Sequence, residues 1–206
     1  MKYFLFILLT LCLTNCSEIP VHKSTDDLAM ALNENTIKVI KNVEVPKKQL
    51  VLNQIEGKWY FNNEPFNGYS IKLHSNGNLE ERLGYYNGKR EGTAKRWSEN
   101  GIIRAEYFYK QNRLDGTLKY WWENGALSQE SHYINGVKQG IEKQWFPTGQ
   151  LAKFRHIVDG KEEGMQKAWL DNGKLYVNYE AKNGRIFGMR RANSCYKLEN
   201  ENVVKN

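Results

Sequence analysis

The amino-acid sequence predicts an all-β fold, an elongated antiparallel array of β-hairpins built from about five and a half 24-residue repeats. Three observations predict it. Tryptophan recurs every 24 residues. Glycine recurs with the same period in three series, the most regular of which is Gly68, Gly92, Gly116, Gly140, Gly164 and Gly188. The stretches between the glycines are rich in β-branched and aromatic residues and show no helical periodicity.

Each repeat is expected to hold two strands and two turns. In the third repeat the expected strands are residues 116–122 and 126–134. Asn124-Gly125 between them is expected to be a tight turn with positive φ at both residues, because Asn-Gly is the strongest short hairpin signal. Residues 135–140 are expected to be a longer connection, and every repeat glycine is assigned to a turn. Strands linked in this way form an antiparallel meander.

Large side chains recur in register and predict the core. We expect three columns to interleave into one apolar stripe, which a single repeat could not bury alone. The columns are Trp97, Trp121, Trp145 and Trp169; then Leu79, Ile103, Leu127, Leu151 and Leu175; then Tyr85, Tyr109, Tyr133 and Ile157, with Ala181 as a small last member.

The beginning of the chain is expected to be a signal. Lys2 precedes an apolar run over residues 4–13, which is shorter than the ~20 residues of a membrane-spanning helix. Residues 1–15 resemble a bacterial lipoprotein signal followed by Cys16, which implies that Cys16 becomes the lipidated N-terminus. An ordinary secretion signal is the alternative.

The rest of the chain divides into three predicted segments. Residues 16–56 are expected to be the lipidated end and a polar tether, with a brief helix near residues 28–32. The tether is expected to end in a strand at residues 58–61. Residues 57–192 are expected to be the repeat array, and residues 193–206 a polar tail.

Cysteines and charge narrow the classes of function. Cys12 lies in the signal and Cys16 would carry lipid, which leaves Cys195 without a disulfide partner. The net charge is +7, and residues 57–192 hold 22 basic against 15 acidic residues. This excess favours an anionic headgroup, lipopolysaccharide or an acidic partner. We expect no nucleic-acid partner, because the protein would be exported.

Two segments carry a resemblance to a known family. The stretches WWENGALSQESHYINGVKQG (121–140) and LHSNGNLEERLGYYNGKREG (73–92) are similar to the MORN-variant repeat of bacterial proteins classed with the YwqK-type antitoxins. EPFNG at residues 64–68 also resembles that family, and the likeness covers residues 57–192. It implies hairpin arrays used for protein or membrane contact, without a shared catalytic residue. The family label further implies an antitoxin-like role as an alternative.

A row of lysines is the main candidate binding surface. Each lies two residues before a repeat tryptophan, on the same side of its strand, so the ammonium groups would stand ~10 Å apart. They could meet anionic groups, or their stems could cover the aromatic stripe while the charges stay in water. The candidate ligand- or partner-binding residues are therefore Lys95, Lys119, Lys143, Lys167, Trp97, Trp121, Trp145 and Trp169.

Other candidate sites are rejected on spacing. His132 and His156 share one repeat position, but their backbones should lie ~10 Å apart, too far for one zinc ion. Glu99, Glu123 and Asp171 precede the Asn-Gly turns, where solvent leaves nothing to raise a carboxyl pKa for acid catalysis. We therefore expect no catalytic residue, no metal and no cofactor.

These observations predict a non-enzymatic, lipid-anchored protein of the bacterial cell envelope. The lipid on Cys16 would anchor the protein in the membrane. Ser17 after Cys16 resembles the corresponding residue of outer-membrane lipoproteins, and the sequence leaves open which leaflet the protein faces. The repeat surface would be a scaffold for a protein or membrane contact. A module that binds polysaccharide or peptidoglycan is the alternative, because tryptophans can stack on sugar rings.

Overall fold

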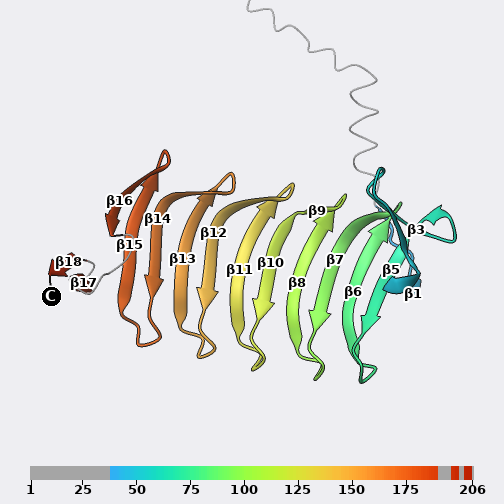
Figure 1. Cartoon of the computed structure of the whole chain (residues 1–206), viewed down its shortest axis with the longest axis horizontal. Helices are drawn as coiled ribbons and strands as arrows, with labels where there is room; N and C mark the ends of the chain where they lie inside the picture. The colour runs from blue at the N-terminus through green and yellow to red at the C-terminus, as the bar shows by residue number, and fades with distance from the viewer. Residues whose placement is uncertain (1–37, 190–195, 200–201, 206) are drawn as a thin grey trace, which may run out of the picture. The chain divides into compact units, whose positions relative to one another are not determined.

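The computed structural model describes residues 38–189, 196–199 and 202–205. The expected signal, the lipidation site Cys16, the brief helix and Cys195 lie outside these residues. Within them one sheet of 13 strands dominates, and its strands follow one another along the sheet nearly in sequence order (Figure 1). The predicted all-β hairpin array is confirmed.

The strands of this sheet have lengths that repeat with the sequence. In spatial order they are β1 (Glu44–Pro46), β5 (Gly68–Leu73), β6 (Leu79–Tyr86), β7 (Lys89–Trp97), β8 (Ile103–Lys110), β10 (Gly116–Trp121), β11 (Leu127–Ile134), β12 (Val137–Trp145), β13 (Leu151–Val158), β14 (Lys161–Trp169), β15 (Leu175–Lys182) and β16 (Arg185–Met189). The short β9 (Arg113–Leu114) pairs with β8.

Almost every neighbouring pair is antiparallel, as the sequence predicts. The exception is β1, which pairs with β5 in parallel from Glu44 opposite Tyr69 to Pro46 opposite Ile71. A parallel neighbour cannot be reached by a tight turn. The chain instead leaves β1 through a short 3-10 helix at Lys47–Gln49 before it reaches β5. β1 therefore covers what would otherwise be the open first edge of the array.

The two kinds of turn are the reverse of the prediction. Asn135 and Gly136 form the two-residue connection between β11 and β12, with φ of 51° and 86°. Positive φ at both positions is the type I′ geometry. Asn124-Gly125 instead lies in a five-residue loop, where Gly125 N–H donates to the Trp122 carbonyl (3.0 Å) and only the glycine has positive φ. Asn-Gly serves both loops, so the dipeptide alone does not distinguish them.

The most regular glycine series does not mark turns. Gly92, Gly140 and Gly164 lie inside β7, β12 and β14, with φ of 77°, 74° and 85°. The strand register slips at these places, for example between Glu130 and His132 on the strand opposite Gly140. These glycines therefore form β-bulges, which bend the strand and need a residue that tolerates positive φ.

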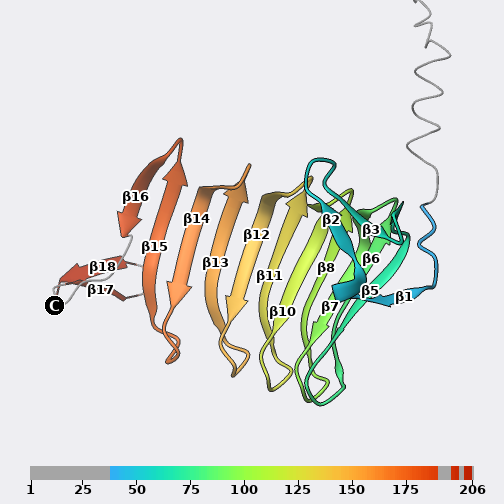
Figure 2. The same cartoon turned by 45° about the vertical axis from the view of Figure 1, so that its right-hand side comes forward.

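A small second sheet packs on the first strands of the array. It contains β2 (Val51–Asn53), β3 (Lys58–Phe61) and β4 (Glu64–Pro65), and Figure 2 shows it in front of the main sheet. The buried cluster beneath it includes Val45, Leu50, Phe66, Leu83, Tyr85 and Ala94, with Trp59 packed against them. Residues 44–53 were expected to be part of a polar tether, but Val45 and Leu50 in this segment help to complete the core. We call residues 44–66 the cap.

The rest of the core differs from the predicted stripe. The tryptophan and leucine columns are only half-buried, whereas Tyr85, Ile157 and Ala181 of the third column are buried. The most regularly buried position changes identity from repeat to repeat. Its members are Ser70, Ala94, Leu118, Glu142 and Gln166, all at most 6% exposed. Because these residues share no chemistry, the sequence pattern does not reveal them.

The predicted C-terminal tail holds structure of its own. β17 (Tyr196–Glu199) and β18 (Asn202–Lys205) pair as an antiparallel hairpin. Across the described part of the chain, no helix has the length and apolar character needed to cross a bilayer.

Candidate functional site: an aromatic groove along the repeats

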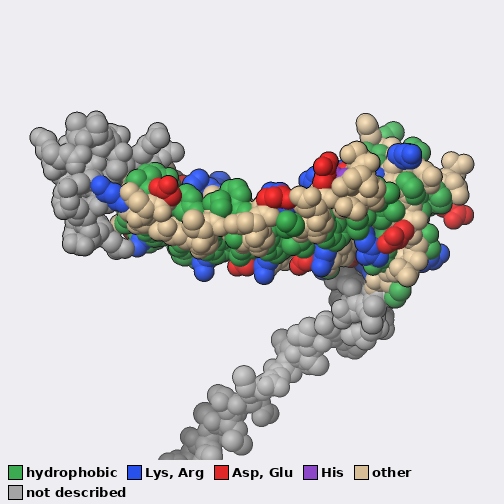
Figure 3. Space-filling model, turned by 90° about the horizontal axis from the view of Figure 1, so that it is seen from below, with side chains coloured by type: hydrophobic (Ala, Val, Ile, Leu, Met, Phe, Trp, Pro, Cys, Tyr) green, Lys and Arg blue, Asp and Glu red, His purple; other side chains and the backbone are tan. Residues whose placement is uncertain are grey.

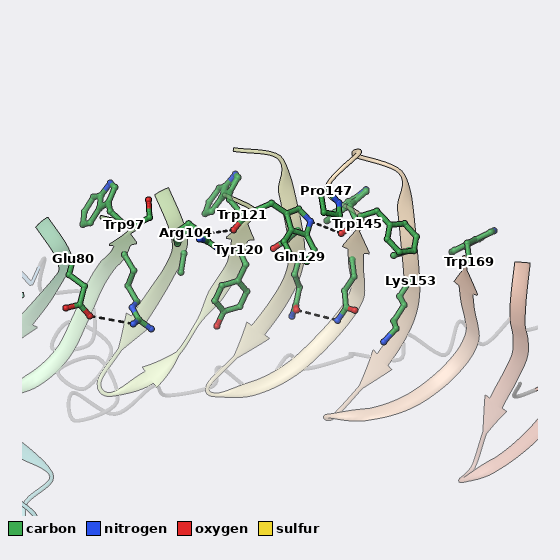
Figure 4. Close-up of a pocket in the computed structure, with 18 of the residues that line it drawn as sticks. Glu80, Trp97, Arg104, Tyr120, Trp121, Gln129, Trp145, Pro147, Lys153 and Trp169 are labelled. Atoms are coloured by element: carbon green, nitrogen blue, oxygen red, sulfur yellow. Dashed lines mark hydrogen bonds and ion pairs between the residues drawn. The ribbon is translucent and has the colours of Figure 1, made fainter. Parts of the chain in front are cut away.

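A groove of ≈ 830 Å³ runs across the repeats near the ends of the strands (Figure 4). All four repeat tryptophans line it, so the structure brings together one half of the predicted binding residues. Further aromatic side chains come from neighbouring positions. The aromatic lining is Trp97, Tyr120, Trp121, Trp122, Trp145, Phe146, Trp169 and Tyr176.

The groove lies where each strand gives way to a five-residue loop. Three consecutive residues, Tyr120, Trp121 and Trp122, all line it, so it follows the strand end rather than one face of the sheet. Beside each tryptophan the partner strand carries one extra residue, as β11 does with Ser128, because Gln129 lies opposite Tyr120 and Leu127 opposite Trp121. Arg104 and Tyr176 occupy such slipped positions and also line the groove. Loop and bulge together therefore repeat the same hollow in each unit.

Side chains tie successive units together at the tryptophan carbonyls. The Trp122 indole N–H donates to the Trp145 carbonyl (2.9 Å), and Arg104 Nε donates to the Trp121 carbonyl (2.9 Å). His74 Nε2 lies 2.9 Å from the Trp97 carbonyl. Because three different residue types make these contacts with the tryptophan carbonyls, no residue repeated in the sequence marks them.

Most charged groups in the groove are paired. Arg96 lies 3.8 Å from Glu80, and Arg104 forms an ion pair with Glu123. Lys153 is exposed, and its ammonium group has no ion-pair or hydrogen-bond partner among the described residues. The groove therefore carries one uncompensated positive charge, located between Trp145 and Trp169 in the order of the repeats.

A second hollow of ≈ 320 Å³ continues the groove toward the last repeats, since Lys153 and Tyr176 line both. A polar cluster borders it. Glu142 is 1% exposed and forms ion pairs with Lys138 and Arg155. Burial raises the pKa of Glu142, but hydrogen bonds from Lys138 and Arg155 outweigh burial and hold it below the usual value. Gln166 is also buried, and its amide oxygen accepts no hydrogen bond.

The lysine row lies outside the groove and is interleaved with carboxylates. Lys95 pairs with Glu106 (2.9 Å) and Lys119 with Glu130 (3.4 Å), and Lys143 lies opposite Glu130 in the strand register. Figure 3 shows basic and acidic side chains interspersed along the sheet. Lys167 lies between Phe154 and Asn178. The ammonium groups therefore do not form the purely positive row that the spacing alone predicts.

The side chains considered as metal ligands or catalytic acids do not line the aromatic groove. Among residues 38–189 and the two C-terminal strands, no three His, Cys, Asp or Glu side chains come together as metal ligands. His132 pairs with Gln139 and His156 with Ile141, on different strand pairs. Glu123, expected to support a turn, is held by Arg104.

Comparison with known proteins identifies the repeat. Residues 90–111 and 114–135 match the family described as MORN repeat variant. These two segments span β7 to β11, and the same 24-residue period continues on both sides. Two adjacent repeats of the array are similar to the MORN repeat variant. Such repeats are in general scaffolds that bind proteins or membranes.

No curated protein sequence matches this chain. Among solved structures, it is similar to a chain of the "Crystal structure of GtfA/B complex bound to UDP and GlcNAc", with 16% sequence identity and a TM-score of 0.26. The match covers 81% of this chain and 37% of that one. The chain thus spans well under half the length of that structure.

Proposed function

We propose that this protein is a non-enzymatic scaffold that binds a partner protein along the aromatic groove and is tethered to the cell envelope by lipid on Cys16. The observation that carries the proposal is the groove itself. It presents the same aromatic positions from successive repeats, and only Lys153 among its charged groups lacks a partner in the described residues. An extended surface of repeated hollows suits an extended partner.

Contact with an anionic membrane is less well supported. Each basic group near an anionic surface contributes ~1 kcal/mol, provided that it is not already neutralised. In the lysine row Glu106 and Glu130 stand between successive ammonium groups. Aromatic residues, by contrast, dominate the energetics of protein interfaces.

A glycan partner is the second candidate, because eight aromatic side chains line the groove and exposed indole rings stack on sugar rings. One experiment separates these partners. A photo-crosslinking amino acid replaces Trp121 in the full-length chain, and a second version carries it at Phe108, an exposed residue of β8 outside the groove. Both are irradiated in cells.

The proposal expects a protease-sensitive adduct of discrete mass from position 121 and none from position 108. An adduct removed by glycan-cleaving enzymes would show that the partner is a glycan, and one extracted with lipid would support membrane contact.

A second experiment tests the anchor. Cys16→Ser should abolish incorporation of a labelled fatty acid. Incorporation that persists in this variant would contradict the tether.

A further inference from the structure

We propose that the groove takes a proline-rich segment in the polyproline II conformation, with an acidic residue placed to meet Lys153. This inference rests on the proposed protein-binding function and names the kind of segment bound. Three independent properties of the groove lead to it: its period, its unused hydrogen-bond donors and its charge.

The period distinguishes the possible backbones. Equivalent positions in successive repeats are two strands apart, a distance of about 9.6 Å. One turn of polyproline II contains three residues and rises about 9.3 Å, so every third residue faces the same way. Over the three intervals from Trp97 to Trp169 the mismatch reaches only about 1 Å.

Other backbones fit this spacing less well. In an α-helix, residues seven apart lie about 10.5 Å from each other, and the mismatch over three intervals grows to about 3 Å. In a β-strand the side chains alternate, so residues three apart face opposite sides. A polyproline II segment alone keeps the register with every repeat.

Donors in the groove match what this backbone needs. Polyproline II has no internal hydrogen bonds, so its carbonyl groups require outside donors. Trp122 donates its indole N–H to a neighbouring carbonyl. The indole N–H groups of the four repeat tryptophans have no acceptor among the described residues. Aromatic-lined grooves are a recurring way to bind proline-rich segments, whose preformed shape lowers the entropic cost of ordering.

Charge complementarity sets the acidic position. Arg96 and Arg104 already have carboxylate partners, whereas Lys153 has none in the described part of the chain. Ala168 and Gln144 flank Lys153 in the sheet register and bring no compensating charge. A glutamate in the bound segment would supply it.

The test uses the full-length chain in detergent and calorimetric titration with a synthetic peptide of twelve residues. The peptide has proline at two of every three positions and one central glutamate, and in polyproline II it spans about 37 Å. A glycine peptide, with every proline replaced, keeps the glutamate but lacks the preformed shape. We expect the proline peptide to bind at least tenfold more tightly than the glycine peptide.

Substitutions locate the site. Trp121→Ala should weaken binding at least tenfold, and Phe108→Ala should leave it unchanged. Should Trp121→Ala fail to fold, the charge swap decides. Lys153→Glu should weaken binding of the glutamate peptide at least threefold and strengthen binding of a matching lysine peptide.

Equal binding of the proline and glycine peptides, or an unaltered preference in Lys153→Glu, would overturn the inference. So would binding of a soluble chitin oligosaccharide with no binding of the proline peptide. A protein adduct from position 121, together with no binding of any of the peptides, would contradict this inference but would still support the protein-binding function.

Discussion

At the scale of single residues, the core is defined by position more than by chemistry. The row that contains Leu118, Glu142 and Gln166 is buried throughout, although its members are apolar, acidic and amide in turn. Repeated tryptophans attract attention in the sequence, yet they are only half-buried and line a groove. The repeated tryptophans therefore located the groove better than they located the core.

Glu142 gives the first prediction. Replacing it by glutamine removes the charge that compensates Lys138 and Arg155. We expect Glu142→Gln to lower the free energy of unfolding by about 2 kcal/mol in urea at pH 7, less than for a fully buried pair because Arg155 is partly exposed. Glu130→Gln, in an exposed pair with Lys119, should cost less than about 0.5 kcal/mol.

The same pair makes stability depend on pH in the acid range. Since the pKa of Glu142 is lowered in the folded state, its contribution is present above the unfolded value of 4.5 and is lost as pH falls through the folded value. Urea midpoints measured from pH 6 to pH 3 should therefore fall less steeply in Glu142→Gln than in the wild type. Parallel curves would contradict this assignment.

Lys47 gives a prediction in the alkaline range. Burial lowers its pKa to about 8, although its ammonium donates to Tyr85 Oη and lies 3.2 Å from the centre of the Trp59 ring. Between pH 8 and the unfolded value of 10.5 the unfolded chain binds more protons, so stability should rise with pH.

Thermal midpoints at pH 7.5 and pH 9.5 check this. Lys47→Met should show a smaller rise than the wild type over this interval, in which tyrosines of the unfolded chain, with a pKa of 10.0, are still mostly protonated. Burial raises the pKa of Tyr85 to about 12, so the unfolded tyrosine loses its proton first and stability should fall above pH 10. An identical rise in Lys47→Met would rule out Lys47 as the source.

At the scale of elements, the sequence predicted the meander and the order of strands but exchanged the two turns. Asn-Gly occurs at residues 124–125 and again at residues 135–136, so turn propensity alone does not show which pair forms the two-residue turn. What separates them is the bulge beside Trp121, which adds a residue to one strand and opens the adjoining loop. The groove follows from this bulge and loop, so the sequence could name its tryptophans but not its shape.

The turn assignment is open to a matched pair of substitutions. Asn135 has a φ of 51°, a region that alanine disfavours, whereas Asn100 in a five-residue loop is not among the positive-φ residues. We expect Asn135→Ala to lower the free energy of unfolding by about 1 kcal/mol and Asn100→Ala by less than about 0.5 kcal/mol. Urea denaturation measures both, and equal costs would restore the original turn assignment.

At the scale of the whole array, stability should be divided among units. Each strand pairs only with its neighbours, so removal of one full repeat, residues 117–140, should leave the pairing order intact. We expect this variant to keep a β-type circular dichroism spectrum and a cooperative thermal transition at a lower midpoint.

Removal of residues 117–128 is the control for this deletion. It takes out half a repeat, so one strand would run in the wrong direction against its neighbour. We expect loss of the cooperative transition. Equal behaviour of the two deletions would mean that the 24-residue repeat is not the structural unit.

The parallel strand β1 closes one border of the array, so lengthening can occur only by insertion between existing units or beyond the last. Slippage during gene replication supplies such insertions in whole copies. Each copy would extend the aromatic hollow by one step of about 9.6 Å without inventing a new contact. The number of repeats would thus set the length of the groove, and this length could change without any change in the contacts within a repeat.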